Sequence, residues 1–138
     1  MKEGANMCIF CKIVNGEIPC YKIYEDQDTL AFLDIAHDID GHTLVIPKKH
    51  VENILDCDLK TLTKVAKTVK KVSRYYVNKK HFDGVNTFNC NNAAAEQSVM
   101  HYHVHILPRR KDDNQQVCPE LNCAKKSLEE TQKKLKMK

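Results

Sequence analysis

The chain has 138 residues, 42% of them hydrophobic and none of them Trp, so it fits one domain and leaves little room for a second. No window holds the roughly 18 uninterrupted apolar residues of a spanning helix, and residues 1–6 lack the apolar core of a signal peptide. The net charge of +4 at pH 7 suits small phosphorylated ligands better than nucleic acid. We therefore expect a cytoplasmic protein that binds neither nucleic acid nor a membrane.

The composition divides the chain into three parts. Residues 1–6 are interpreted as a leader or an expression remnant, and residues 7–110 as the folded domain. Residues 111–138 form a charged loop followed by a predicted helix from Pro119 to the C-terminus, because proline is favoured in the first helical turn. Seven cysteines in a chain without a secretion signal indicate buried, metal-bound or reactive thiols rather than disulfides.

The first third of the domain, residues 7–47, is predicted to form short strands broken by turns. The runs 21–24 and 29–33 are rich in β-forming residues and flank a polar segment, which predicts a β-hairpin. The run 43–46 ends at Pro47 and predicts a buried strand, because proline cannot continue the strand pairing.

The hydrophobic period changes at Asp58. Apolar residues recur at spacings of three and four, with lysines between them, and predict an amphipathic helix over 58–78 with Asp58 as its N-cap. The dipeptide Asp83-Gly84 predicts a turn into a strand at 85–90. A last strand is expected from about Val99 to Leu107.

The stretch 101–108 holds three histidines that alternate with large β-forming residues. Because side chains alternate along a strand, His101, His103 and His105 share one face, and the other face is apolar. A tris-His metal site is difficult, since such neighbours are about 7 Å apart while metal bonds are about 2 Å. Incidental surface histidines do not explain the strict alternation. A third interpretation makes one imidazole a nucleophile and the others phosphate ligands.

Several further motifs accompany the histidines. Gln97-Ser98-Val99 precedes the row and Pro108-Arg109 follows it. Matching segments occur at residues 8–13, 16–19, 32–35 and 41–50. Over roughly residues 8–110 the sequence resembles the histidine triad (HIT) superfamily of nucleotide hydrolases and transferases. The resemblance implies an α+β fold with a five-stranded antiparallel sheet, a long helix packed on it and a C-terminal helix. It also implies a homodimer joined through the long helices.

The resemblance implies roles for the catalytic set. His103 resembles the nucleophile that attacks the α-phosphate and forms a covalent nucleotidyl-histidine, which water then resolves. His105 is similar to the histidine that holds phosphate oxygens and assists the leaving group. Ser98 resembles the hydroxyl near that group. His101 is the first histidine of the triad, and His42 resembles a further histidine beside it.

Nucleotide-binding residues are also implied. Asp34 resembles the carboxylate that accepts both ribose hydroxyls, although from the residues alone a turn carboxylate is the simpler explanation. The base pocket is implied to contain Phe10, Ile18, Phe32, Ile35 and Leu44. Backbone N–H groups of Gln97, Ser98 and Val99 can cradle phosphate, together with His103 and His105.

The pair Cys8-x-x-Cys11 is by itself compatible with a redox pair, half a zinc site or coincidence. The residues after it resemble a strand and a turn rather than the helix of a redox motif. Resemblance to the zinc-containing, bacterial-type branch of the family implies that His50 and His101 complete a closed tetrahedral site for structural zinc. No organic cofactor is expected.

The leading hypothesis is hydrolysis of purine nucleoside phosphoramidates or related nucleotidyl conjugates, with release of a nucleoside monophosphate. One alternative is a dinucleoside polyphosphate hydrolase or nucleotidyltransferase, and another is a zinc-stabilised nucleotide-binding protein with little turnover. Glu96 stands where the family usually has glycine, and Cys90 and Asn92 depart from its upstream Asn-x-Gly pattern. Neither departure changes the triad.

Overall fold

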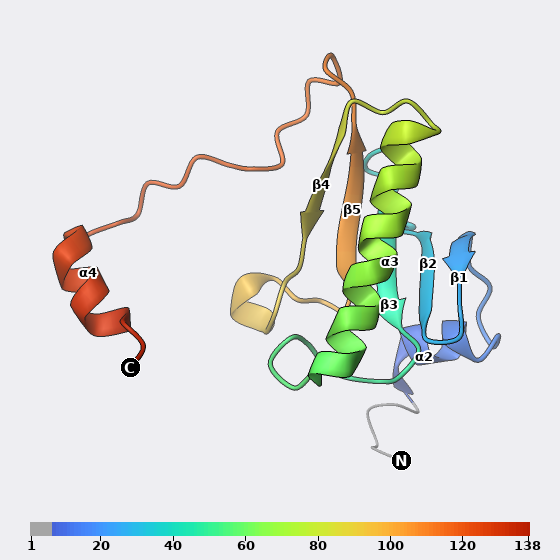
Figure 1. Cartoon of the computed structure of the whole chain (residues 1–138), viewed down its shortest axis with the longest axis horizontal. Coiled ribbons are helices and arrows are strands. Elements are labelled where there is room, and N and C mark those ends of the chain that lie inside the picture. Colours follow the sequence, from blue (N-terminus) through green and yellow to red (C-terminus); the bar gives the residue numbers. More distant parts are fainter. Residues whose placement is uncertain (1–6) are drawn as a thin grey trace.

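The structure is a computed structural model that describes residues 7–138, so the expected leader at 1–6 lies outside the described residues. A five-stranded antiparallel sheet, in the order β1-β2-β3-β5-β4, carries the long helix α3 across one face (Figure 1). The strands are β1 (Lys22–Glu25), β2 (Thr29–Leu33), β3 (Thr43–Pro47), β4 (Gly84–Phe88) and β5 (Val104–Arg109). The helices are α2 (Ile9–Val14), α3 (Leu59–Asn78), the short 3-10 helix η1 (Ala93–Ala95) and α4 (Leu128–Leu135).

This arrangement confirms the expected α+β class, the hairpin of β1 and β2, and the strand that ends at Pro47. Within residues 7–138, no helix combines the length and the apolar character that crossing a membrane demands.

Alternation of side chains along the strands creates two cores, one on each face of the sheet. The core beneath α3 contains Ala31, Val45, Val65, Val72, Tyr76 and Ile106. The core on the opposite face contains Cys8, Phe10, Leu30, Phe32, Leu44 and Ile46. The short helix α2 covers this second face, which is also the face that His105 shares with its register partner Leu44.

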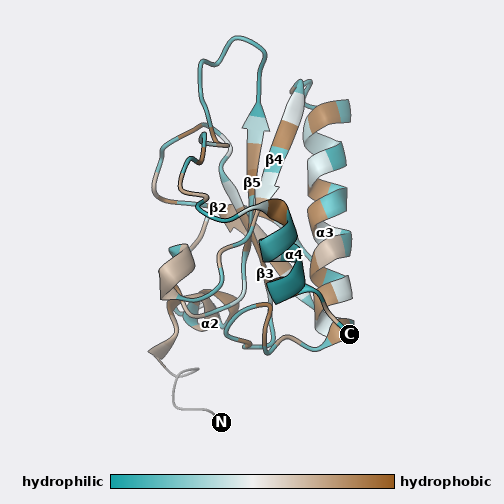
Figure 2. Cartoon of the chain, turned by 90° about the vertical axis from the view of Figure 1, so that its left-hand side faces the viewer, coloured by the Kyte–Doolittle hydropathy of each residue, from teal (hydrophilic) through white to brown (hydrophobic). Residues whose placement is uncertain are grey.

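Helix α3 follows the predicted span 58–78. Asp58 is its N-cap, and the carboxylate accepts a hydrogen bond from the Thr61 backbone N–H at 3.0 Å. Its buried residues are Thr61, Val65, Thr68, Val72 and Tyr76, spaced to form one stripe. Figure 2 shows apolar and polar residues interleaved along the helix. A 2.6 Å hydrogen bond between the hydroxyls of Tyr76 and Thr43 joins this stripe to β3.

The expectation of strands throughout 7–47 is wrong for residues 9–14, which form α2. Sγ of Cys8 caps this helix by accepting a hydrogen bond from the Cys11 backbone N–H. Phe10 is buried against Phe32, with ring centroids 5.5 Å apart. This tertiary contact outweighs the β preference of the Ile and Val residues in the segment.

The last strand begins at Val104 rather than Val99. The backbone N–H of Tyr102 donates to the Val51 carbonyl at 2.8 Å, and the Asn89 side chain donates to the His103 carbonyl at 2.8 Å. These bonds to loop residues replace strand pairing before residue 104. The expected alternation still holds, because the residues that pack in or against the α3 core are Tyr102, Val104 and Ile106.

The C-terminal helix begins at Leu128, so the expected start at Pro119 is wrong. The hydroxyl of Ser127 accepts a hydrogen bond from the Glu130 backbone N–H at 3.2 Å and caps the helix there. Figure 1 shows α4 set apart from the sheet at the end of an extended segment.

Candidate active site and metal centre

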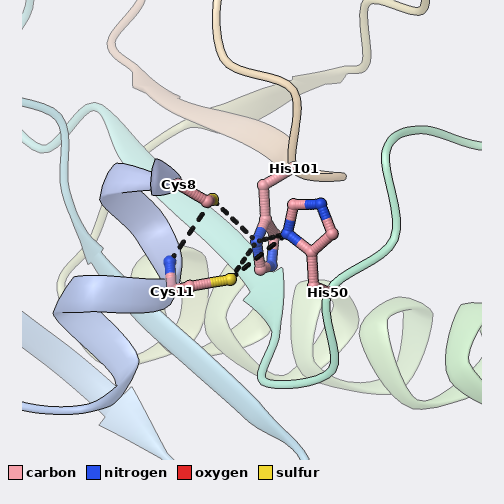
Figure 3. A group of neighbouring side chains, drawn as sticks. All are labelled: Cys8, Cys11, His50 and His101. Carbon is pink, nitrogen blue, oxygen red and sulfur yellow. Dashed lines mark hydrogen bonds between the residues drawn. The ribbon is translucent and has the colours of Figure 1, made fainter. Parts of the chain in front are cut away.

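A cluster of two cysteines and two histidines lies between α2, the loop after β3 and the segment before β5 (Figure 3). Sγ of Cys8 is 3.4 Å from Nδ1 of His101, and Sγ of Cys11 is 3.2 Å from Nδ1 of His50. The two Nδ1 atoms are 3.2 Å apart. A tetrahedral zinc ion, with bonds of about 2.3 Å to sulfur and about 2.0 Å to nitrogen, separates its ligand atoms by about 3.3–3.8 Å. The donor set and its spacing therefore fit zinc.

The surroundings of His101 determine which of its nitrogens faces the cluster. Nε2 lies 2.8 Å from the Pro47 carbonyl oxygen. Since a carbonyl only accepts, Nε2 carries the proton and Nδ1 presents its lone pair to the sulfurs. Burial, aided by the charge of His50, lowers the pKa of His101 to about 4. The imidazole is consequently neutral at pH 7, the form in which it can bind a metal.

His103 is the middle residue of the triad and is buried. Its Nδ1 donates a hydrogen bond to the His101 carbonyl oxygen at 2.7 Å, which leaves the lone pair on Nε2. The ring packs edge-on against Phe10, with centroids 5.3 Å apart. Burial lowers the pKa of His103, so the nucleophilic, neutral ring predominates at pH 7.

His105 lies at the end of a chain of hydrogen-bonded groups. Its Nδ1 is 2.9 Å from Nε2 of His42, and Nδ1 of His42 is 2.7 Å from a carboxylate oxygen of Asp38. An ionised carboxylate only accepts, so Nδ1 of His42 carries a proton. Burial, together with the charges of His103 and His42, lowers the pKa of His105 to about 4.

Asp34 opens the loop that connects β2 with β3. One carboxylate oxygen accepts a hydrogen bond from the Ala36 backbone N–H at 2.8 Å, as a turn residue does. The other oxygen lies 3.6 Å from Nε2 of His42. Asp34 therefore stabilises its own turn and still places one oxygen beside the histidines.

The structure brings together only part of the expected base pocket. Of the expected pocket residues, three belong to the core beside α2, namely Phe10, Phe32 and Leu44. Val99 packs against this core. Ile18 is half-buried. Ile35 is 84% exposed and lies outside the packed cluster.

Gln97 is buried, and its side-chain amide is fully occupied. Oε1 accepts from the Asn53 side chain and the Asn92 backbone N–H, at 3.2 and 2.8 Å. Nε2 donates to the carbonyls of Glu52 and Val99, at 2.7 and 3.0 Å. These four bonds use the whole capacity of the amide. The backbone N–H of Gln97 also donates to the Asn92 carbonyl at 3.1 Å, so the N–H group that was expected to cradle phosphate is already used.

The residues on either side of Gln97 have distinct surroundings. Ser98 is exposed and lines a cavity of about 480 Å³ that also borders Cys8 and His50. Within residues 7–138, its hydroxyl forms no hydrogen bond to a triad histidine, so the structure places it on the metal side of the site. Glu96 adopts the left-handed conformation, with φ of 69°, which glycine occupies at least cost.

Reasoning from the sequence missed two residues of the site. These are Asp38 and Phe88, whose ring stacks on His105 at 4.3 Å and 9°. The pairing of β4 with β5 places Phe88 opposite His105, and the neighbouring Asn89 supports the His103 carbonyl with its side-chain amide. For Asp38 a weak signal existed, since a carboxylate four residues before His42 can reach its ring across a tight loop.

Known proteins resemble this chain in sequence and in structure. The HIT domain family model matches residues 15–112. The relative named Protein hit from Bacillus subtilis is 48% identical over 105 residues, which cover 76% of this chain and 72% of the relative. Adenosine 5'-monophosphoramidase hnt1 from Schizosaccharomyces pombe is 40% identical over 106 residues, or 77% of each chain. The crystal structure of a zinc-bound histidine triad family protein from Mycobacterium smegmatis has a TM-score of 0.77 at 36% identity, over 86% of each chain.

Proposed function

Because the chain belongs to the HIT family, we propose that it hydrolyses purine nucleoside phosphoramidates or related nucleotidyl conjugates at the α-phosphorus. The product is a nucleoside monophosphate, and the intermediate is a nucleotidyl group on Nε2 of His103. The similarity to an adenosine 5'-monophosphoramidase supports the substrate class.

The observation that carries the proposal is the 2.7 Å hydrogen bond from Nδ1 of His103 to the His101 carbonyl, which reserves Nε2 for attack. In the first step the Nε2 lone pair forms a bond to phosphorus, the bond from phosphorus to the leaving amine breaks, and the amine takes up a proton. In the second step water attacks phosphorus and gives up a proton to His105, the bond from phosphorus to Nε2 breaks and the neutral ring of His103 returns. Two easier displacements thus replace one difficult attack by water.

Substrate binding is assigned to the residues around this nitrogen. The free carboxylate oxygen of Asp34 accepts from the ribose hydroxyls, and the aromatic rings of Phe10 and Phe32 border the base. His105 contacts phosphate oxygens, and the backbone N–H groups of Ser98 and Val99 complete the anion site. The proximity of Asp34 to the histidines and the packed apolar cluster support this assignment.

We also propose a structural zinc ion at Cys8, Cys11, His50 and His101. The lone pair of Nδ1 of His101, directed at two thiols and a second imidazole, supports this proposal. When bound, zinc cross-links α2 to the segment that precedes β5. The His101 carbonyl that orients His103 belongs to that segment.

A homodimer joined through α3 is the assembly we propose. Two large residues at the two ends of this helix, Leu59 and Tyr75, are 79% and 46% exposed in the single chain. Burying such residues against a second copy favours association. Light scattering during size-exclusion chromatography should give twice the mass of one chain, and a mass of one chain would contradict the proposal.

The test of the proposed function compares wild type with His103→Ala and a matched control, His81→Asn. His81 is exposed and has a positive φ, which asparagine tolerates. Labelled adenosine 5'-phosphoramidate is mixed with each protein, quenched in acid and analysed for AMP and for protein-bound label. Wild type and His81→Asn should release AMP and carry label on His103. The His103→Ala variant should lose label and at least about a thousandfold in rate.

Other outcomes would change the assignment. Faster turnover of diadenosine polyphosphates than of the phosphoramidate would favour the polyphosphate hydrolase alternative, with the same nucleophile. AMP binding by wild type without turnover or label would favour a nucleotide-binding protein.

A further inference from the structure

We infer that Asp38 is a positioning residue that acts through His42 to let His105 deliver a proton to the leaving group. This inference rests on the proposed function. The inference adds to the proposed mechanism a proton relay of one carboxylate and two imidazoles, in which Asp38 is the group farthest from the substrate.

Direct contacts connect the three groups. Oδ1 of Asp38 accepts from Nδ1 of His42 at 2.7 Å, and Nε2 of His42 lies 2.9 Å from Nδ1 of His105. The same Asp38 oxygen accepts from the Ile39 backbone N–H at 2.9 Å, which holds the carboxylate in place. The loop itself is closed by hydrogen bonds from the Asp34 N–H to the His42 carbonyl and from the His42 N–H to the Ile39 carbonyl.

Asp34 is the competing carboxylate, but its geometry is less favourable. Its nearer oxygen is 3.6 Å from Nε2 of His42, which is beyond a normal hydrogen bond. In addition, Nε2 of His42 is the nitrogen that already contacts Nδ1 of His105. Asp38, in contrast, contacts the outer nitrogen of His42 and leaves the inner nitrogen for His105.

The charges around His105 explain why a relay is needed. Burial and the neighbouring rings of His103 and His42 hold the pKa of His105 near 4, while Asp34 and Asp38 oppose that shift. Phe88 covers one face of the ring and adds no charge. An isolated His105 is therefore neutral at pH 7 and a poor proton donor. The hydrogen bond and charge of His42 outweigh partial burial and keep the pKa of Asp38 below its usual value, so Asp38 remains anionic.

The proton count balances over one cycle. When the two rings share one extra proton, the cation resides on His42 beside the Asp38 anion, and His105 carries its proton on Nε2. As the bond from phosphorus to the amine breaks, the Nε2 proton moves to the amine nitrogen. Nδ1 of His105 then takes the Nε2 proton of His42. Both rings end neutral, with Nδ1 of His42 still donating to Asp38, and a proton from water recharges the pair.

The experiment uses Asp38→Asn, which retains one acceptor oxygen, replaces the other with an amide NH2 and removes the charge, and Asp38→Glu, which restores the carboxylate. Asp40→Asn is the control, because Asp40 is an exposed carboxylate in the same loop. Each full-length protein is assayed with adenosine 5'-phosphoramidate, whose amine must be protonated, and with the 4-nitrophenyl ester of AMP, whose leaving group needs no proton. The imidazole protonation of His42 and His105 is followed separately by ¹⁵N NMR.

For Asp38→Asn we expect kcat for the phosphoramidate to fall at least about tenfold, a part of the 10²–10⁴-fold that general acid catalysis contributes. For the nitrophenyl ester kcat should change less than about threefold. The alkaline limb of the phosphoramidate profile and the NMR midpoint of the pair should both move to lower pH, because removing the anion destabilises the cation. Asp38→Glu should recover much of the rate, and Asp40→Asn should match wild type.

Equal losses on both substrates, or no loss on either, would overturn the role of Asp38. An unchanged NMR midpoint in Asp38→Asn would do so independently of activity. Absence of turnover and of label on His103 in wild type would instead contradict the proposed function, while the NMR midpoint would still report whether Asp38 stabilises the protonated pair.

Discussion

The backbone carbonyl of His101 accepts the Nδ1 proton of His103 at 2.7 Å, while the side chain of His101 points into the Cys/His cluster. One residue therefore belongs to both the metal centre and the catalytic row. Displacing the His101 side chain is expected to move the carbonyl that sets the tautomer of His103. The metal centre should thus affect both stability and catalysis.

Removal of the metal tests this connection. We expect one zinc per chain in wild type and less than about a tenth of that in Cys11→Ser, with Tm lower by about 10 °C, equivalent to roughly 2–3 kcal/mol. Atomic emission and thermal unfolding measure the two quantities. The control is Cys123→Ser, which alters an exposed cysteine of the tail and should retain both values. Equal zinc content in Cys11→Ser and wild type would refute the assigned ligands.

Glu96 combines backbone strain with a charge beside the proposed anion site, and two substitutions separate these effects. Glu96→Gly should raise the free energy of unfolding by about 0.5–1 kcal/mol, because glycine adopts the φ of 69° at less cost. Glu96→Gln should leave stability nearly unchanged. Both should lower KM for an anionic nucleotide, since both remove a negative charge. Urea unfolding measures the free energy of unfolding, and steady-state kinetics measure KM. An unchanged KM in both variants would mean that the Glu96 charge does not affect nucleotide binding.

The buried amide of Gln97 should be important for stability. Gln97→Ala removes the partners of the Asn92 N–H and the Glu52 carbonyl, and leaving such groups unsatisfied should cost about 2–4 kcal/mol. Urea unfolding measures the loss. Gln132→Ala, in α4, is the matched exposed control. A loss under about 0.5 kcal/mol in Gln97→Ala would mean that water replaces the missing bonds.

The low pKa of His105 predicts a pH dependence of stability. The unfolded chain binds a proton at His105 below about pH 6.5, whereas the folded chain does so only near pH 4. The free energy of unfolding should therefore fall between these values as pH falls, by roughly 2–3 kcal/mol from this group. Urea unfolding of wild type and His105→Gln at pH 7.0 and 4.5 measures the difference, which should be smaller in the variant. Parallel losses in the two proteins would assign the effect to other groups.

Local patterns determined much of the fold and of the site's composition. The three-and-four spacing after Asp58 predicts α3 because one apolar stripe must face the sheet. The alternation of residues 101–106 separates histidines from core residues even where strand pairing is absent. Where a long-range contact opposes local propensity, the sequence misleads, as for α2, whose buried Phe10 packs on β2.

From the sequence by itself, the periodicity of short segments predicted the long helix, most of the strands and the shared face of the three histidines. The resemblance to the HIT superfamily implied the antiparallel α+β domain and the ligands of the metal centre. Only the tertiary structure decided how these segments meet. Pairing of β3 with β5 places His42 against His105, and the intervening loop then brings Asp38 to His42. The packing of α2 brings Cys8 and Cys11 to His101. Such contacts depend on sheet register and loop closure between residues up to 93 positions apart, which no local pattern encodes.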